Sequence, residues 1–216
     1  SWADPGQQSK PTAWTGLSFP YLKDSVYRYT RQVLTAMKVN NTLPDMVQIG
    51  NEIICGILWN DGRVCDAHNT PPQWSQFAGL LTEAIRGVRE SLTANDTVKI
   101  MLHIDRGADS AGSRWFFDNL QMHNVPYDVI GLSYYPWWHG GLDQVAANLQ
   151  MLSLRYNKDI ILVETAYPWT LGWNDTVHNI VGLPSQLLPG YPATVEGQQT
   201  FLRDMISLVR ATPNNK

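Results

Sequence analysis

The feature that most limits the fold is a regular alternation of short apolar runs with helix-like segments. Apolar runs bounded by turn-forming residues predict buried strands, at residues 46–52, 98–104, 128–135 and 159–164. Apolar residues at helical spacing follow each run and also precede the first one. Such alternation is typical of a parallel α/β sheet, because parallel strands need a long crossover that is usually a helix.

Two architectures contain a sheet of this kind, a doubly wound open sheet and a (β/α)8 TIM barrel. No predicted strand leads into a Gly-rich phosphate loop, which weakens the case for the doubly wound sheet. The four predicted strands are too few to close an eight-stranded barrel. We therefore predict a section of a (β/α)8 TIM barrel, with residues 1–216 forming a single barrel domain that is incomplete at both ends.

Charge and apolar content narrow the possible partners. The net charge of −3 offers no electrostatic attraction to nucleic acid or to anionic membranes. No apolar run approaches the length of about 18 residues that a membrane-spanning helix needs. The nine Trp and nine Tyr residues suit stacking on sugar rings, although core packing must claim several of them. We expect a monomer that binds carbohydrate and neither nucleic acid nor membrane.

Two glutamates occupy matching positions in this pattern. Glu52 ends the first predicted strand and Glu164 ends the last. In a β/α barrel, the carboxyl ends of the strands surround the active site. Two carboxyl groups from different strands suit glycosidic bond cleavage, one as acid and the other as nucleophile or base. The alternative is that each glutamate is an ordinary surface charge at a strand end, and we favour the catalytic interpretation.

The two cysteines, Cys55 and Cys65, both lie in the loop that follows Glu52. Their spacing allows a disulfide, which fits an oxidising compartment. Two free buried thiols are the alternative, and the disulfide is slightly favoured.

Five segments match motifs of a known family. They are residues 2–6 (WADPG), 48–53 (QIGNEI), 56–59 (GILW), 133–140 (SYYPWWHG) and 164–169 (ETAYPW). With these segments, the chain resembles glycoside hydrolase family 53, the endo-β-1,4-galactanases that cut arabinogalactan. The resemblance implies a retaining, endo-acting hydrolase of β-1,4-galactan in plant pectin, secreted or at the cell surface and needing no cofactor. It places this chain at about strands 4 to 7 of the barrel, so that the fragment alone is expected to lack parts of the active site.

Two other functions stay open at this point. A related barrel enzyme that cleaves mannan or xylan would carry the same pair of glutamates. A fragment that binds carbohydrate without cleaving it is the second alternative. The presence of both Glu52 and Glu164 argues against an enzyme that has lost its catalytic residues.

The resemblance implies a role for each glutamate. Glu52 is the acid/base and must hold a proton, whereas Glu164 is the nucleophile and must be ionised. Asn51, immediately before the acid, is expected to bind the sugar hydroxyl next to the reacting carbon. In a retaining enzyme the two carboxyl groups lie about 5–5.5 Å apart.

Strand alternation provides candidates beside the glutamates. His103 and Asp105 share one face of their strand, which should point to the barrel mouth. His103 is either a residue of the sugar site or a satisfied core histidine. The resemblance implies a tyrosine that donates a hydrogen bond to the nucleophile, with Tyr135 as the first choice and Tyr134 as the second.

Further substrate contacts follow strand ends or come with the resemblance. They are expected at Trp2, Asp4, Trp137, Trp138, His139 and Trp169. Core burial is the alternative for at least one of the three later tryptophans.

No metal site is predicted. By the resemblance, bacterial members of the family can bind a calcium ion in the long loop after strand seven, where Asp175 and Asn179 could act as ligands. The carboxylate count is low for a Ca²⁺ site, so a solvated loop is favoured. No His-Glu-x-x-His or Cys-x-x-Cys spacing indicates zinc.

Overall fold

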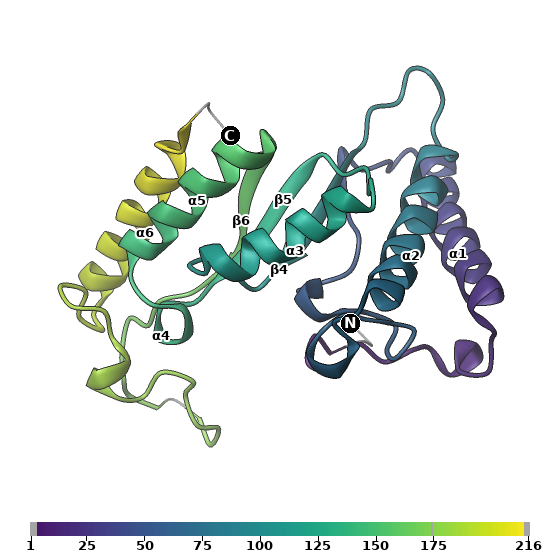
Figure 1. Cartoon of the computed structure of the whole chain (residues 1–216). Helices are drawn as coiled ribbons and strands as arrows, with labels where there is room; N and C mark the ends of the chain where they lie inside the picture. Colours follow the sequence, from purple (N-terminus) through teal and green to yellow (C-terminus); the bar gives the residue numbers. More distant parts are fainter. Residues whose placement is uncertain (1–3, 174, 214–216) are drawn as a thin grey trace. The chain divides into compact units, whose positions relative to one another are not determined.

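Figure 1 shows the computed structural model of the chain, which describes residues 4–173 and 175–213. The chain divides into two compact units. Unit 1 consists of Ser1–Ile104 and Trp115–Ile130, and unit 2 of Asp105–Arg114 and Gly131–Lys216. The expectation that all 216 residues form one catalytic domain stays a prediction.

Four strands form one sheet in the order β1-β4-β5-β6. They are β1 (Met46–Gln48), β4 (Lys99–Ile104), β5 (Val129–Tyr134) and β6 (Asp159–Thr165). β1 runs parallel to β4, with Met46 beside Lys99 and Gln48 beside Met101. The strands therefore follow one another in chain order, as in a barrel, and the order does not reverse as it does in a doubly wound sheet.

In unit 1, α1 (Phe19–Val39) and α2 (Pro71–Arg89) lie side by side (Figure 1). α2 begins after Thr70, whose hydroxyl accepts a hydrogen bond from the Gln73 N–H at 3.4 Å. A side chain at Gly87 would lie 2.7 Å from the Tyr27 carbonyl oxygen, so glycine lets the two helices approach closely.

Aromatic side chains fill the core of unit 1. Trp74 and Phe77 of α2 contact Phe116 in α3 (Ser110–Met122), with ring centroids 6.1 and 5.9 Å apart. Phe117 continues the cluster to Tyr127 at 5.5 Å. Several of the abundant aromatic residues thus pack in the core, as the composition led us to expect.

Unit 2 contains α4 (Pro136–His139), α5 (Leu142–Tyr156) and α6 (Val195–Arg210), with α5 and α6 side by side (Figure 1). Its core holds Tyr167 stacked on Phe201, with ring centroids 4.3 Å apart. The Tyr167 hydroxyl donates to the Tyr191 carbonyl at 2.6 Å, which ties the chain after β6 to the segment that precedes α6. Across residues 4–173 and 175–213, no helix combines the length and the apolar character that crossing a membrane requires.

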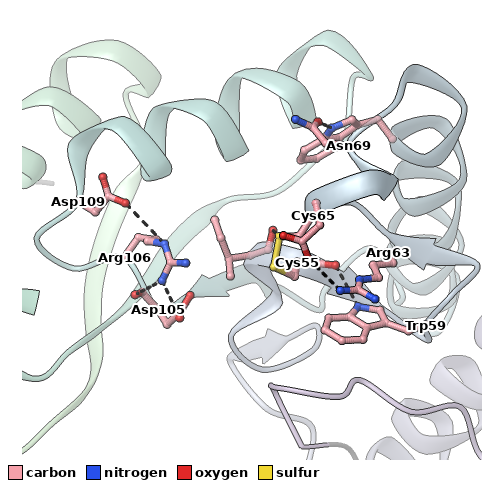
Figure 2. Close-up of a disulfide and its surroundings, with 11 residues drawn as sticks. Cys55, Trp59, Arg63, Cys65, Asn69, Asp105, Arg106 and Asp109 are labelled. Carbon is pink, nitrogen blue, oxygen red and sulfur yellow. Dashed lines mark hydrogen bonds and ion pairs between the residues drawn. A yellow bond between two sulfur atoms is a disulfide. The ribbon is translucent and has the colours of Figure 1, made fainter. Parts of the chain in front are cut away.

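The loop between β1 and α2 carries a disulfide (Figure 2). Cys55 and Cys65 are bonded, with their Cα atoms 4.9 Å apart, which confirms the favoured pairing. Within the loop, β2 (Gly56–Ile57) pairs antiparallel with β3 (Gly62–Arg63). The Arg63 guanidinium lies over the Trp59 ring, 4.4 Å from its centroid. The disulfide therefore closes a short hairpin immediately after Glu52.

We expect the double substitution Cys55→Ser/Cys65→Ser to lower the free energy of unfolding by about 2–4 kcal/mol, because the unfolded chain regains the freedom that the cross-link removes. Denaturant unfolding of the full-length protein with and without a thiol reductant measures this effect. Reductant should destabilise the wild type by a similar amount and leave the double variant unchanged. Equal stability of oxidised and reduced wild type would contradict the prediction.

Candidate active site

The chain leaves the sheet before it reaches Glu52. β1 ends at Gln48, and the Ile49 N–H continues the pairing by donating to the Met101 carbonyl at 3.0 Å. Gly50 then takes a φ of 75° and Glu52 a φ of 48°, both in the left-handed region. A side chain at Gly50 would lie 2.4 Å from Cγ2 of Ile53, so a sharp turn is possible only with glycine there. The prediction of a strand running to Glu52 is therefore wrong at its end, although Glu52 still follows the strand.

Asn51 is held by a connected set of hydrogen bonds in unit 1. Gln48 Nε2 donates both to the Gly50 carbonyl at 2.8 Å and to Asn51 Oδ1 at 3.1 Å. A carbonyl oxygen can only accept a hydrogen bond. The bond to the Gly50 carbonyl therefore identifies the nitrogen of the Gln48 side-chain amide, and the bond from that nitrogen identifies the oxygen of the Asn51 side-chain amide. His103 Nδ1 lies 3.1 Å from the same Asn51 Oδ1 and must therefore be the donor. His103 is 0% exposed, so it supports Asn51 from a buried position.

Sequence reasoning did not single out Gln48, although it lies in the matched QIGNEI segment. Strand alternation places Gln48 and Gly50 on one face and says nothing about a bond to Asn51. Only the turn at Gly50 brings the Gln48 amide back to the Asn51 side chain.

Glu164 lies in unit 2, near the end of β6, and is half-buried. The Tyr135 hydroxyl donates to Glu164 Oε2 at 3.0 Å. Tyr134 is fully buried and instead donates its hydroxyl to the Gly140 carbonyl at 2.7 Å, and burial raises the pKa of Tyr134. The alternation along β5 is the reason that one tyrosine reaches the carboxylate and its neighbour does not.

If Glu164 is catalytic, as the sequence led us to expect, Tyr135→Phe in the full-length protein should lower kcat/KM by about 10- to 100-fold, because a hydrogen bond to a charged group contributes about 1.5–3 kcal/mol. Tyr191→Phe is the matched control, since the Tyr191 hydroxyl also donates to a carboxylate, Asp204 Oδ2 at 3.2 Å. The control should change stability and leave turnover nearly unaltered. Steady-state kinetics on both variants give the comparison, and equal turnover in the two would contradict a role for Tyr135.

The short helix α4 presents three of the expected substrate contacts. Trp138 is 63% exposed, and its ring contacts Trp137 with centroids 5.6 Å apart. Trp137 is half-buried, and its indole Nε1 has no hydrogen-bond partner among residues 4–173 and 175–213. His139 Nδ1 accepts from the Tyr135 N–H at 3.0 Å, and burial lowers the pKa of His139 although Asp105 opposes the shift. His139 is therefore neutral at pH 7, with its proton on Nε2.

Asp105 follows β4 and belongs to unit 2. Arg106 Nη1 donates to Asp105 Oδ2 at 2.8 Å, and Arg106 Nε also lies 3.6 Å from Asp109 Oδ2 (Figure 2). The other oxygen, Asp105 Oδ1, is buried and lacks a hydrogen-bond partner within the part of the chain that the structure describes. Arg106 therefore orients the carboxylate and leaves one acceptor for another group.

The remaining expected contacts differ in their surroundings. Trp169 is 51% exposed in the segment after β6. Asp4 is exposed, and its Oδ1 accepts from the Gly6 N–H at 2.7 Å, within its own turn. Trp2 lies outside the described residues.

The two possible calcium ligands make local contacts within their loop. Asp175 Oδ1 accepts from the Val177 N–H at 2.8 Å, and Asn179 Nδ2 donates to the Gly172 carbonyl at 3.0 Å. These bonds are those of a loop whose polar side chains cap its own backbone.

Comparison with known proteins identifies the family. A family model described as "Glycosyl hydrolase family 53" matches residues 1–216. The chain belongs to this family. The resemblance inferred from the five sequence segments is thereby confirmed.

Two relatives in sequence match nearly the whole chain. The chain is 50% identical over 213 residues to the "Uncharacterized protein in bgaB 5'region" of Niallia circulans, covering 98% of this chain and 57% of that protein. It is 34% identical over 211 residues to the "Endo-beta-1,4-galactanase" of Bacillus subtilis, covering 98% of this chain and 46% of that enzyme. The chain thus spans about half the length of the curated relatives it matches.

Solved structures share the fold. The Ignisphaera aggregans GH53 catalytic domain superposes with a TM-score of 0.89 at 41% identity, covering 100% of this chain and 57% of that one. A structure of fungal beta-1,4-galactanases gives a TM-score of 0.82 at 28% identity, covering 100% of this chain and 62% of that one. Together with the sequential sheet order, these matches confirm the predicted α/β section of a (β/α)8 TIM barrel.

Proposed function

We propose that the protein carrying this chain is a retaining, endo-acting glycoside hydrolase that cleaves β-1,4-galactan. The observation that carries the proposal is the bond from Tyr135 to Glu164 Oε2, in a chain whose family motif also provides Asn51 and Glu52. Relatives named endo-beta-1,4-galactanase and arabinogalactan endo-beta-1,4-galactanase, at 34% identity, support the substrate.

The proposed reaction proceeds in two steps. In the first, the Glu164 carboxylate attacks the anomeric carbon while Glu52 gives its proton to the departing glycosidic oxygen. This produces a covalent glycosyl-enzyme and releases one part of the polysaccharide. In the second, Glu52, now ionised, takes a proton from the water that attacks the same carbon and frees Glu164. Each step inverts the anomeric centre, so the product retains the original configuration.

Tyr135 and Asn51 assist these steps. The Tyr135 hydroxyl orients the Glu164 carboxylate by donating to Oε2. Asn51 Oδ1 already accepts from Gln48 and His103, which leaves the two Nδ2 hydrogens to donate to a sugar hydroxyl beside the reacting carbon. The carboxyl groups perform the proton transfers and the first nucleophilic attack, and water performs the second, so this mechanism needs no cofactor.

Exposed rings and unpaired polar atoms support binding of a sugar chain. Trp138 is 63% exposed and Trp169 is 51% exposed, which suits stacking of their rings on the apolar faces of galactose units. Trp137 Nε1 and Asp105 Oδ1 offer one donor and one acceptor to hydroxyl groups. Asp4, His139 and Trp2 are proposed to complete the substrate site.

We further propose that the substrate is the galactan of plant pectin and that the enzyme acts outside the cell as a monomer. The Cys55–Cys65 disulfide supports export, because disulfides persist in oxidising compartments. Galactan side chains of a cell wall are also too large to enter a cell, so a secreted or surface-bound enzyme suits them.

The deciding experiment is digestion of a panel of polysaccharides by the full-length protein. We expect internal cleavage of β-1,4-galactan to short oligosaccharides, with retained configuration in the first NMR spectra of the product. Mannan, xylan and cellulose should stay intact. Cleavage of one of these in place of galactan would move the enzyme to a related specificity. Binding to galactan without cleavage would establish the non-catalytic alternative.

A further inference from the structure

Gln8 is a buried polar residue that the proposed mechanism does not use. It lies in unit 1 and is 5% exposed. Its side-chain Nε2 donates to the main-chain carbonyl of Asn51 at 3.0 Å, across 43 positions of sequence. Burial of a polar amide is costly unless it is hydrogen-bonded, and this bond satisfies the requirement.

The bond acts on the peptide group that joins Asn51 to Glu52. A peptide is planar, so fixing the Asn51 oxygen also fixes the N–H of Glu52 and the direction in which the Glu52 chain continues. Glu52 holds a φ of 48°, a conformation that a residue with a side chain adopts only where its surroundings enforce it. Gln8 is one such restraint, and it acts directly on the neighbouring carbonyl.

Gln8 is itself held by two separate parts of unit 1. Its N–H donates to the Asp4 carbonyl at 2.7 Å, within the turn that Asp4 begins. Its own carbonyl accepts from the Trp59 N–H at 2.9 Å, in the disulfide-closed loop. Lys10 forms an ion pair with Asp61, which ties the same segment to that loop a second time. The Gln8 amide is therefore presented to Asn51 from a fixed backbone.

We propose that Gln8 is a positioning residue for Glu52, through the peptide between Asn51 and Glu52. This inference rests on the proposed function, which assigns proton transfer to Glu52. Without the Gln8 amide, the peptide can rotate and carry the Glu52 carboxyl away from the glycosidic oxygen. The competing interpretation is that Gln8 only anchors the segment around Asp4 and Lys10, in which case its loss affects stability and every substrate alike.

The test compares Gln8→Met with Gln7→Met in the full-length protein. Methionine keeps the length of the side chain and removes the donor, and Gln7 is the exposed neighbour in the same turn. Two substrates are used, galactan and a dinitrophenyl β-galactobioside whose leaving group needs no proton in the first step. Gln8→Met should lower kcat/KM on galactan by about 10- to 100-fold, since small misplacements of a catalytic group have effects of this size. The aryl substrate should lose less than about 3-fold, and Gln7→Met should match the wild type on both.

Gln8→Glu provides a rescue that depends on pH. A protonated carboxyl at this position can donate to the Asn51 carbonyl, whereas an ionised one can only repel it. The activity of Gln8→Glu relative to wild type should therefore fall as pH rises. An unchanged ratio across the pH range would contradict the positioning role.

Equal losses of Gln8→Met on galactan and on the aryl substrate would also overturn the inference. If the wild type cleaves another glycan, the proposed substrate is wrong, and the same comparison is made on that glycan. If it cleaves none, a crystal structure of Gln8→Met decides. A rotated peptide between Asn51 and Glu52 supports the inference, and an unchanged peptide with Glu52 still near its φ of 48° overturns it.

Discussion

Replacing the proposed nucleophile as Glu164→Ala should reduce the turnover of galactan by the full-length protein by at least about 10⁴-fold. The substitution removes the atom that forms the covalent bond to the sugar, and no other step can substitute for it. The Tyr135 hydroxyl, which donates to Glu164 Oε2, would then face a small space where the carboxylate was. Steady-state kinetics on galactan and on an activated aryl glycoside measure the loss, which should affect both substrates.

A small external nucleophile should partly restore Glu164→Ala. Azide can enter the space left by the carboxylate and attack the anomeric carbon from the same side. One attack inverts the centre, so the product should be a glycosyl azide of inverted configuration, identified by NMR. Glu196→Ala is the control, because Glu196 is exposed in the first turn of α6. Near-native turnover of Glu164→Ala would show that the nucleophile lies elsewhere.

Replacing the proposed acid as Glu52→Ala should lower kcat/KM on galactan by about 10²–10⁴-fold, the usual contribution of a general acid. Galactan has a poor leaving group, which needs the proton from Glu52. An activated aryl glycoside leaves without it, so its first step should suffer much less. Slow hydrolysis of the glycosyl-enzyme should instead limit kcat for the aryl substrate, because Glu52 also serves as the base in the second step.

Azide distinguishes the two glutamates by stereochemistry. In Glu52→Ala the nucleophile Glu164 is intact, so azide intercepts the covalent intermediate and the product keeps its configuration. In Glu164→Ala the product is inverted. Glu52→Ala could instead lose activity on galactan and on the aryl glycoside to the same extent and form no azide product. That result would show that Glu52 is not the acid/base.

The order of strands and helices could be predicted because each element is specified locally. The apolar run at 159–164 and the observed strand Asp159–Thr165 differ by a single residue at one end. Strand β5 runs from Val129 to Tyr134 against a predicted 128–135. A continuous apolar run and the flanking turn formers contain enough information to place such strands.

The end of β1 could not be predicted in the same way. The run from Met46 to Glu52 is apolar enough to continue as a strand, but Gly50 turns the chain away after Gln48. The side chain of Ile53 occupies the space that any residue other than glycine would need at position 50. Periodicity in the sequence cannot reveal such a contact, because it indicates on which face of a strand a residue lies and not which side chain the residue contacts there.

The sequence by itself determined the family, the strand order and the two candidate glutamates. It also limited any intramolecular disulfide to Cys55–Cys65, because the chain has only two cysteines, and the structure decided that this bond forms. Tertiary structure alone decided the left-handed backbone at Glu52, the protonated nitrogen of His103 and the bond from Gln8 to Asn51. The physical reason is the separation along the sequence over which each interaction acts. Apolar spacing and motifs act over a few residues, whereas a hydrogen bond that spans 43 positions exists only after the chain has packed.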